Sequence, residues 1–237
     1  MRRGLVFSGR CEKTVIIQLT YPRGVPLEDR FFGNANIFSE GEKRSLVSFH
    51  PDLYKYWETT TEITKPIYAG HKGLKDVTRM QLIDLNLWLP GDILMKADKM
   101  SMAHSLEVRV PFLDKEVFEI AQKIPASLLL AIGTTKYILR KALEGIVPHS
   151  VLGRPKLGFP VPLKKWLLTP MGDTILQQIT ESGVDQWIQL NVVKEMLKQH
   201  RMGTADYSRK IWTIYIFSLW HSMYIKQSTF RQALVNS

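Results

Sequence analysis

The sequence has one cysteine, Cys11, and no long hydrophobic run. A single cysteine cannot form an internal disulfide, and no Cys/His cluster beside it indicates a zinc site. The longest apolar run, residues 211–220, is shorter than the roughly 20 residues that a membrane-spanning helix needs. The first residues include two arginines, but no sustained apolar segment or cleavage site follows them. We therefore expect a cytoplasmic protein with no membrane span and no thiolate-bound metal.

Two common nucleotide-binding motifs, GxxxxGK[ST] and GxGxxG, are also missing. Strand candidates are scarce, with one alternating run at residues 14–21. Open α/β sheets bind nucleotides beyond the carboxyl ends of their strands, and no βαβ series is present to form such a crevice. The sequence predicts a mainly α protein. If it serves a nucleotide enzyme, the phosphate-binding loop lies on another segment.

Acidic residues are fewer than basic ones, 22 against 32, which gives a formal net charge of +10. This balance favours an anionic partner, which could be nucleic acid, acidic lipid or a phosphorylated small molecule. The basic residues are spread along the chain without a dense tail, so most of them are expected on solvated helix faces. A nucleic-acid-binding helical module stays open on charge alone, although no helix-turn-helix or RNP-like pattern supports it. Nucleic acid is not the expected partner.

Helical periodicity begins near residue 74 and continues to residue 88, where Pro90 and Gly91 are predicted to end the helix. A second helix is expected to begin near Asp92. Asp114 is a plausible N-cap for a helix over residues 115–124, and Thr134 or Thr135 for one over residues 136–146.

The second half of the chain alternates a stiff loop with further helices. Residues 153–162 hold two glycines and three prolines and predict a non-helical segment. Helical spacing then recurs, with Gly183 and Gly203 as predicted helix terminators, over residues 166–168, 175–179, 192–197 and 210–224.

The most distinctive segment, residues 89–114, reads LPGDILMKADKMSMAHSLEVRVPFLD. On a helix, Asp92, Lys96 and Lys99 would share one face, because three- and four-residue steps return to the same side. Spacing alone leaves two interpretations open, a solvated charged surface or a functional site.

The order of residues in four segments provides evidence that helical spacing does not. Residues 89–114 resemble the signature of the asparagine synthase family. Residues 27–38 (LEDRFFGNANIF), 136–140 (KYILR) and 154–159 (RPKLGF) also resemble this family, in the family's order. The resemblance extends from about Pro26 to about Trp166 and more faintly to the end of the chain.

The resemblance implies a reaction and a fold. In this family an amino-terminal domain hydrolyses glutamine, and ammonia passes through a tunnel to the synthetase domain. That domain uses ATP and Mg²⁺ to activate aspartate as β-aspartyl-AMP, and ammonia then displaces AMP to give asparagine. The synthetase domain is an α/β adenine-nucleotide alpha-hydrolase-like (PP-loop) fold. The chain would be its helical carboxy-terminal part, residues 26–237, after a poorly defined segment, residues 1–25.

Four residues are expected at the active site through this resemblance. Lys156 matches the family's catalytic lysine, and a fixed ammonium can stabilise both the phosphate and the oxyanion. Arg154 either assists it at phosphate or pairs with a carboxylate. Asp92 matches an acidic position near the incoming ammonia, where it could orient ammonia or accept its proton. The alternative for Asp92, a helix N-cap, stays open. Lys96 matches a basic position on the same helix.

Three further residues, Glu107, Arg109 and Asp114, are expected to hold the turn after this helix through buried ion pairs and caps rather than to touch the substrate. No residue of the chain is expected to ligate a metal.

Several parts of the family pattern are absent. The chain has neither the Ser-Gly-Gly-x-Asp-Ser pyrophosphate loop nor the Ser-Gly-Glu-Gly-x-Asp-Glu segment, and Cys11 is not the family's amino-terminal catalytic cysteine. We therefore expect a truncated product, a split subunit or a fragment that works with upstream segments of the same protein or a partner chain. A purely structural or interaction role is the alternative, and a homodimer stays open.

Overall fold

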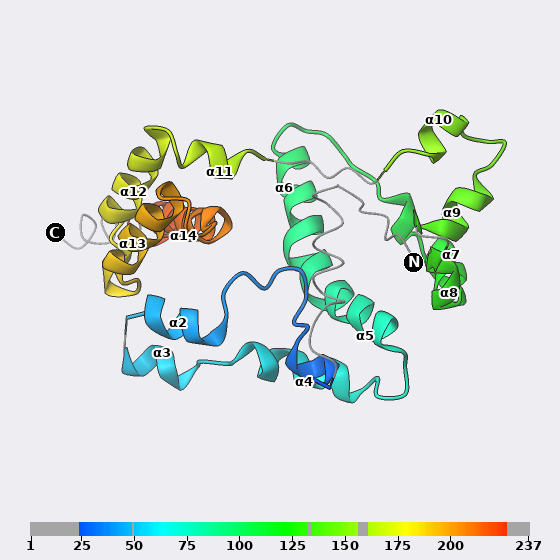
Figure 1. Cartoon of the computed structure of the whole chain (residues 1–237), viewed down its shortest axis with the longest axis horizontal. Coiled ribbons are helices and arrows are strands. Elements are labelled where there is room, and N and C mark those ends of the chain that lie inside the picture. The colour runs from blue at the N-terminus through cyan, green and yellow to red at the C-terminus, as the bar shows by residue number, and fades with distance from the viewer. Residues whose placement is uncertain (1–23, 49, 132–133, 156–160, 227–237) are drawn as a thin grey trace, which may run out of the picture. The chain divides into compact units, whose positions relative to one another are not determined.

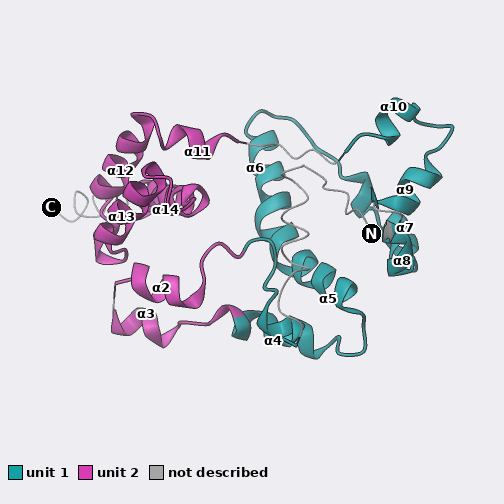
Figure 2. Ribbon diagram, in the orientation of Figure 1, with its two compact units in different colours: residues 1–35, 61–159 teal, residues 36–60, 160–237 magenta. Residues whose placement is uncertain are grey.

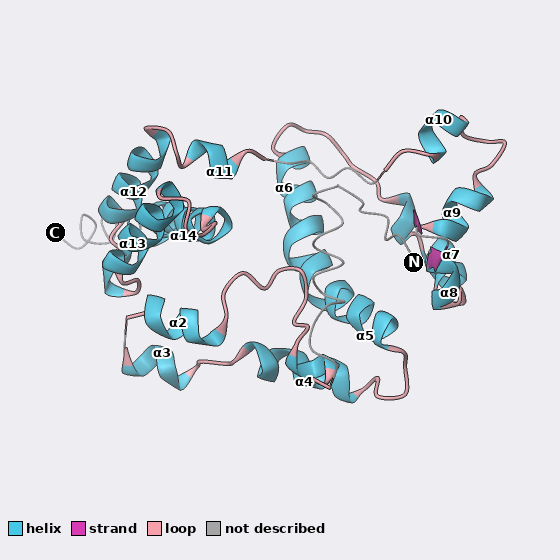
Figure 3. Ribbon diagram, viewed as in Figure 1, coloured by secondary structure: helices cyan, strands magenta, loops and turns pink. Residues whose placement is uncertain are grey.

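The computed structural model describes residues 24–48, 50–131, 134–155 and 161–226 (Figure 1). The chain divides into two compact units that alternate along the sequence (Figure 2). Unit 1 comprises Met1–Ala35 and Thr61–Phe159, and unit 2 comprises Asn36–Thr60 and Pro160–Ser237. Helices dominate the described part of both units (Figure 3), as the sequence predicts. The strand predicted at residues 14–21 lies outside the described residues.

Unit 1 contains short helices and one small hairpin. Its elements, in chain order, are η1 (Leu27–Asp29), α4 (Thr60–Ala69, which begins at the boundary), α5 (Asp76–Ile83), η2 (Asp84–Leu94), α6 (Met95–Met102), η3 (Pro111–Leu113), α7 (Lys115–Ala121), α8 (Ala126–Leu129), β1 (Leu130–Ala131), β2 (Thr134–Thr135), α9 (Tyr137–Ala142) and α10 (His149–Leu152). β1 and β2 are antiparallel, with Leu130 opposite Thr135 and Ala131 opposite Thr134.

A small core joins the start of unit 1 to α4 and α5. Leu27, Phe31, Tyr68 and Ile83 are buried together. The Tyr68 hydroxyl donates a hydrogen bond to the Phe31 carbonyl at 2.7 Å, and burial raises the pKa of Tyr68 to about 12. The segment around Phe31 is thereby fixed against the helix pair.

The predicted helix end at Pro90 and Gly91 is wrong. Both residues lie inside η2, a π-helix that continues directly into α6. Proline is disfavoured in an α-helix interior because it lacks an N–H and its ring meets the carbonyl four residues earlier. A π-helix bonds residue i to residue i+5, and this wider turn relieves the conflict.

The described part of unit 2 is a group of helices with an isolated strand bridge. Its elements are α2 (Glu40–Leu46), α3 (Pro51–Lys55), α11 (Leu163–Trp166), α12 (Met171–Glu181), η4 (Val184–Gln186), α13 (Leu190–Arg201), α14 (Ser208–His221) and η5 (Ser222–Lys226). Val47 pairs with Ile188 in an isolated antiparallel bridge. This bridge ties the early segment of the unit to the late one.

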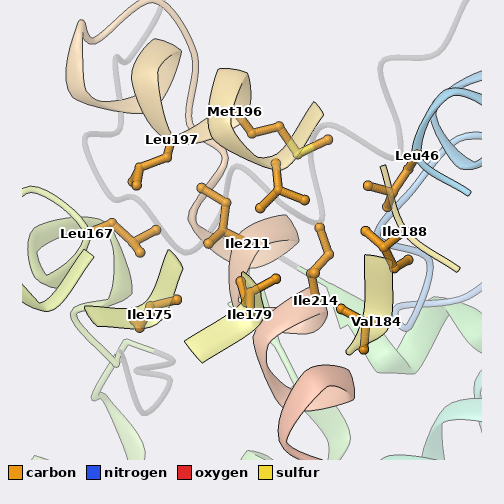
Figure 4. Packing of buried hydrophobic residues seen from close by; sticks show 11 residues of the cluster. Leu46, Leu167, Ile175, Ile179, Val184, Ile188, Met196, Leu197, Ile211 and Ile214 are labelled. Carbon is orange, nitrogen blue, oxygen red and sulfur yellow. The ribbon is translucent and has the colours of Figure 1, made fainter. Parts of the chain in front are cut away.

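The larger core lies inside unit 2 (Figure 4). Its buried side chains come from α2, α12, α13, α14 and the turns between them: Leu46, Leu167, Ile175, Ile179, Val184, Ile188, Val193, Met196, Leu197, Ile211 and Ile214. The predicted helices over residues 175–179, 192–197 and 210–224 supply much of it. α14 is buried on one side only, since Ile211 and Ile214 are enclosed while Ile216 and Trp220 are about half exposed.

Other helix ends follow the sequence in three places, and one more departs from it. Gly183 and Gly203 adopt positive φ angles of 80° and 73° after α12 and α13, which confirms both as terminators. Asp114 caps α7 by accepting hydrogen bonds from the backbone N–H groups of Glu116 and Val117. Thr134 and Thr135 do not cap α9, because both are strand residues of β2. The helix instead follows Lys136, which has a φ of 58°.

The carboxylate of Glu40 makes the stability of unit 2 depend on pH in the acidic range. Burial raises the pKa of Glu40, but the hydrogen bonds from Lys43 and Thr60 outweigh it and lower that pKa to about 2, from 4.5. Thr60 contributes its N–H at 2.8 Å and its hydroxyl at 2.7 Å. A depressed carboxyl pKa stabilises the fold above the unfolded value, and this contribution is lost as pH falls from about 4.5 towards about 2.

We therefore expect Glu40→Gln to reduce the fall in unfolding free energy of unit 2 below pH 5. Urea unfolding can be followed by fluorescence in a Trp88→Phe background, because the other five of the six tryptophans lie in unit 2. Glu195→Gln, on the exposed side of α13, is the matched control and should keep the parent's acid dependence. An unchanged pH profile in Glu40→Gln would contradict the assignment.

Candidate active-site segment

Asp92 lies in the π-helical segment that continues into α6, with both carboxylate oxygens engaged. Trp88 donates its indole N–H to Oδ2 at 3.0 Å, and Lys96 donates from Nζ to Oδ1 at 3.1 Å. These partners stand one turn before and one turn after Asp92, so the predicted shared face of Asp92 and Lys96 is confirmed. The N-cap alternative for Asp92 is wrong, because the residue is inside a helix.

The Asp92–Lys96 pair faces solvent in the described chain. Side-chain exposure is 46% for Asp92 and 60% for Lys96. An exposed pair of this kind contributes little to stability, about 0.3–0.5 kcal/mol on a helix. Its value lies in geometry, because the carboxylate is held by Trp88 and keeps a fixed position beside an ammonium group.

The start of η2 is anchored to a segment that sequence reasoning did not single out for a role. Asn34 donates its backbone N–H to Asp84 Oδ1 at 2.8 Å and its side-chain amide to Asp84 Oδ2. Burial raises the pKa of Asp84 while these two bonds act against it. Gly33 beside it has a φ of 94°, and a Cβ there would lie 3.2 Å from Ile83 and 3.3 Å from Asp84. The only sequence signal was that residues 27–38 resemble the family.

The turn after α6 is held in part as predicted. Glu107 and Arg109 form the expected ion pair, but their side chains are 69% and 84% exposed and not buried. Asp114 caps the following helix. The Glu107–Arg109 pair therefore faces solvent in the described chain.

Arg140 holds the backbone that leads to the Gly/Pro-rich loop. Its guanidinium donates to the carbonyls of Thr135 and Arg154, both at 3.0 Å, and to that of Leu152. One side chain thus fixes β2, the end of α10 and the residue two positions before Lys156. Sequence reasoning missed this role, although residues 136–140 were among the segments that resemble the family.

The predicted site residues are therefore only partly brought together. Asp92 and Lys96 are in contact, whereas Lys156 lies outside the described residues. The Arg154 side chain is exposed and makes no ion pair with the described residues. Within the described ranges, no three His, Cys, Asp or Glu side chains cluster to hold a metal ion. No helix of the described part is long and apolar enough to span a membrane.

Comparison with known proteins identifies the family. The family model described as asparagine synthase matches residues 20–222. Asparagine synthetase [glutamine-hydrolyzing] 1 of Bacillus subtilis is 48% identical over 203 residues, covering 85% of this chain and 31% of that protein. A putative asparagine synthetase [glutamine-hydrolyzing] of Mycobacterium tuberculosis (strain H37Rv) is 46% identical over 216 residues, 90% of this chain and 32% of that protein. The human asparagine synthetase [glutamine-hydrolyzing] is 26% identical over 141 residues, 50% of this chain and 24% of that protein.

No solved structure matches the chain. The chain belongs to the asparagine synthase family, since the family model covers most of its length. It spans about a third of the length of the bacterial relatives it matches.

Proposed function

We propose that this chain is the carboxy-terminal part, residues 26–237, of the synthetase domain of a glutamine-hydrolysing asparagine synthetase. The whole protein would convert aspartate, ATP and glutamine-derived ammonia to asparagine, AMP and pyrophosphate. The observation that carries the proposal is the family match over residues 20–222, which includes the signature at residues 89–114. The identities of 46–48% to bacterial asparagine synthetases support it.

The apolar surface of unit 1 supports the view that further chain normally covers it. From Met95 to Val151 many large apolar side chains are exposed, including Met100 at 64%, Phe112 at 69% and Ile120 at 66%. Exposed apolar area of this extent is unusual on the surface of a complete monomeric protein. We propose that the missing part of the synthetase domain, with the PP-loop and the residues for ATP and Mg²⁺, packs here.

The roles of the site residues follow from the charges in the reaction. The aspartate carboxylate attacks the α-phosphorus, pyrophosphate leaves, and ammonia then attacks the acyl carbon to form an oxyanion before AMP leaves. Lys156, with Arg154 beside it, would neutralise the phosphate and then the oxyanion. Asp92, held by Trp88 and Lys96, would orient ammonia and accept a proton from the nitrogen after attack.

Restoring the missing part tests the proposal. The segment of the Bacillus subtilis relative that precedes the matching region can be joined to this chain. We expect the chimera to form asparagine and AMP from aspartate, ATP and ammonium, whereas the chain alone forms neither, because it lacks the phosphate-binding loop.

Glutamine hydrolysis by the chimera reports whether the added part has folded. A chimera that hydrolyses glutamine and unfolds cooperatively but makes no aspartate-dependent AMP would refute the proposal. Aspartate-dependent AMP formation by the chain alone would refute the expected dependence on the missing part.

A further inference from the structure

An aromatic pocket lies within unit 2, on elements that none of the proposed catalytic residues belongs to. Its volume is about 600 Å³, within the range of roughly 300–1,000 Å³ that is usual for small-molecule sites. Five aromatic side chains line it: Tyr56, Trp57, Trp187, Phe217 and Trp220. The pocket is therefore large enough for an organic molecule and is walled mainly by π faces.

Three of these rings are held by backbone pairing or by a helix. Trp187 precedes the bridge residue Ile188, and its carbonyl accepts the N–H of Ser48 at 2.8 Å. On α14, Phe217 and Trp220 stack with ring centroids 6.0 Å apart. Phe217, Trp220 and His221 thus come from α14, whereas Tyr56, Trp57 and Glu58 come from the segment between α3 and α4.

The charges at the pocket leave a negative excess. Lys43 lines it, but its ammonium is paired with Glu40 at 2.5 Å and donates to Thr60 at 3.0 Å. The same ammonium stands 5.7 Å from the centroid of Trp57, so one wall already accommodates a cation. Glu58 also lines the pocket, and its exposed carboxylate makes no hydrogen bond or ion pair with another described residue.

His221 also lines the pocket. Its Nδ1 lies 3.1 Å from the Ser182 carbonyl, and a carbonyl can only accept, so Nδ1 carries a proton. Nε2 has no hydrogen-bond partner among the described residues, although the side chain is only 4% exposed. A buried ring nitrogen without a partner is uncommon.

We propose that this pocket binds a small organic ammonium ion. Aromatic faces attract cations through their quadrupoles, and Glu58 supplies a counter-charge. Both features favour a cation, and neither favours an anion such as aspartate or a phosphate. The site lies apart from Asp92 and Lys96 on the sequence, and the proposal does not depend on the asparagine synthetase reaction.

Choline and its uncharged isostere 3,3-dimethyl-1-butanol separate cation binding from simple apolar burial. Titrations of the whole chain can be followed by tryptophan fluorescence in the Trp88→Phe background and by saturation-transfer NMR. We expect choline to bind about tenfold more tightly than the isostere. Equal binding of the two compounds, or no saturable binding of choline, would overturn the proposal.

Variants place the binding in this pocket. Trp220→Leu should weaken choline binding about five- to tenfold and Glu58→Gln about threefold, and both residues are exposed enough for the fold to tolerate the change. Glu195→Gln, on α13 and outside the pocket, should leave binding unchanged. Losses of equal size in all three variants would contradict the site.

A second copy of the chain could cover the pocket instead. In that case sedimentation would show a dimer that dissociates in Trp220→Leu, and choline would not bind. That outcome would also overturn the proposal.

Discussion

Replacing Lys156 with alanine in the restored enzyme is expected to lower kcat by about 10²–10³-fold, or roughly 3–4 kcal/mol. The reason is charge. Negative charge develops first on the departing pyrophosphate and then on the tetrahedral oxyanion, and a preorganised ammonium stabilises both. The expected loss is in the rate of aspartate-dependent AMP formation and not in protein yield, because the loop's base is held by Arg140 through the Leu152 and Arg154 carbonyls.

Two companion variants make this result specific. Lys156→Arg should restore little activity, since a planar guanidinium does not replace a compact ammonium. Lys165→Ala, an exposed lysine on α11, should be nearly silent. The assignment fails if Lys156→Ala keeps more than about a third of the activity. Such a loss in rate is well below a tenfold change, which corresponds to about 1.4 kcal/mol. Asp92 and Lys96 then become the next pair to test.

The parts of the fold that the sequence predicted are those that local chemistry decides. Gly183 and Gly203 end helices because a positive φ carries no Cβ penalty in glycine, and Asp114 caps α7 through its own side chain. The helices of unit 2 follow the apolar spacing that its core requires. Each of these features can be read within one or two turns of chain.

The features that were missed depend on contacts or geometry outside such a window. Pro90 was read as a stop because its local rule assumes an α-helix, and a π-helix changes that rule. Asp84 is bound by Asn34, 50 positions earlier, and no local pattern pairs them. Arg140 reaches Arg154 across 14 positions. For the same reason, the local sequence did not indicate how exposed the ion pair of Glu107 and Arg109 is.

The site shows the same division. Helical spacing predicted the contact of Lys96 with Asp92. The indole of Trp88 has the same four-residue spacing, but it was missed because Pro90 and Gly91 were predicted to end the helix between Trp88 and Asp92. The assignment of Lys156 depends on the family resemblance of the RPKLGF segment. It stays a prediction, because Lys156 lies outside the described residues. The kinetic test above is therefore the direct way to decide its role.

A second large effect is expected at Gly172, in the first turn of α12, where alanine should destabilise unit 2 by about 1–3 kcal/mol. A Cβ at Gly172 would lie 2.4 Å from the Leu167 carbonyl oxygen and 3.0 Å from Nη2 of Arg201. The first distance is too short for any contact, so the backbone before α12 would have to move. Leu167 is itself buried in the core, so the displacement disturbs packing as well.

Arg201 would transmit the displacement of Leu167 to the contact between α12 and α13. Its Nε donates to the Leu167 carbonyl at 3.3 Å, and its two terminal nitrogens each bond Asp173 at 2.8 Å. Moving the Leu167 carbonyl therefore strains a bidentate ion pair between α12 and α13 in addition to the core. A side chain with fewer hydrogen bonds than Arg201 could move aside with a smaller loss of stability.

Gly41 provides a matched control, because it occupies the same second position in α2 of the same unit and a Cβ there meets nothing within 4 Å. Gly41→Ala should stabilise unit 2 slightly, by up to about 0.5–1 kcal/mol, since alanine loses less backbone entropy on folding. Urea unfolding in the Trp88→Phe background measures both variants against the parent. The two substitutions are identical in chemistry, so opposite signs would locate the effect in the contact with Leu167. A Gly172→Ala variant as stable as Gly41→Ala would show that α12 can shift away from Leu167 without loss.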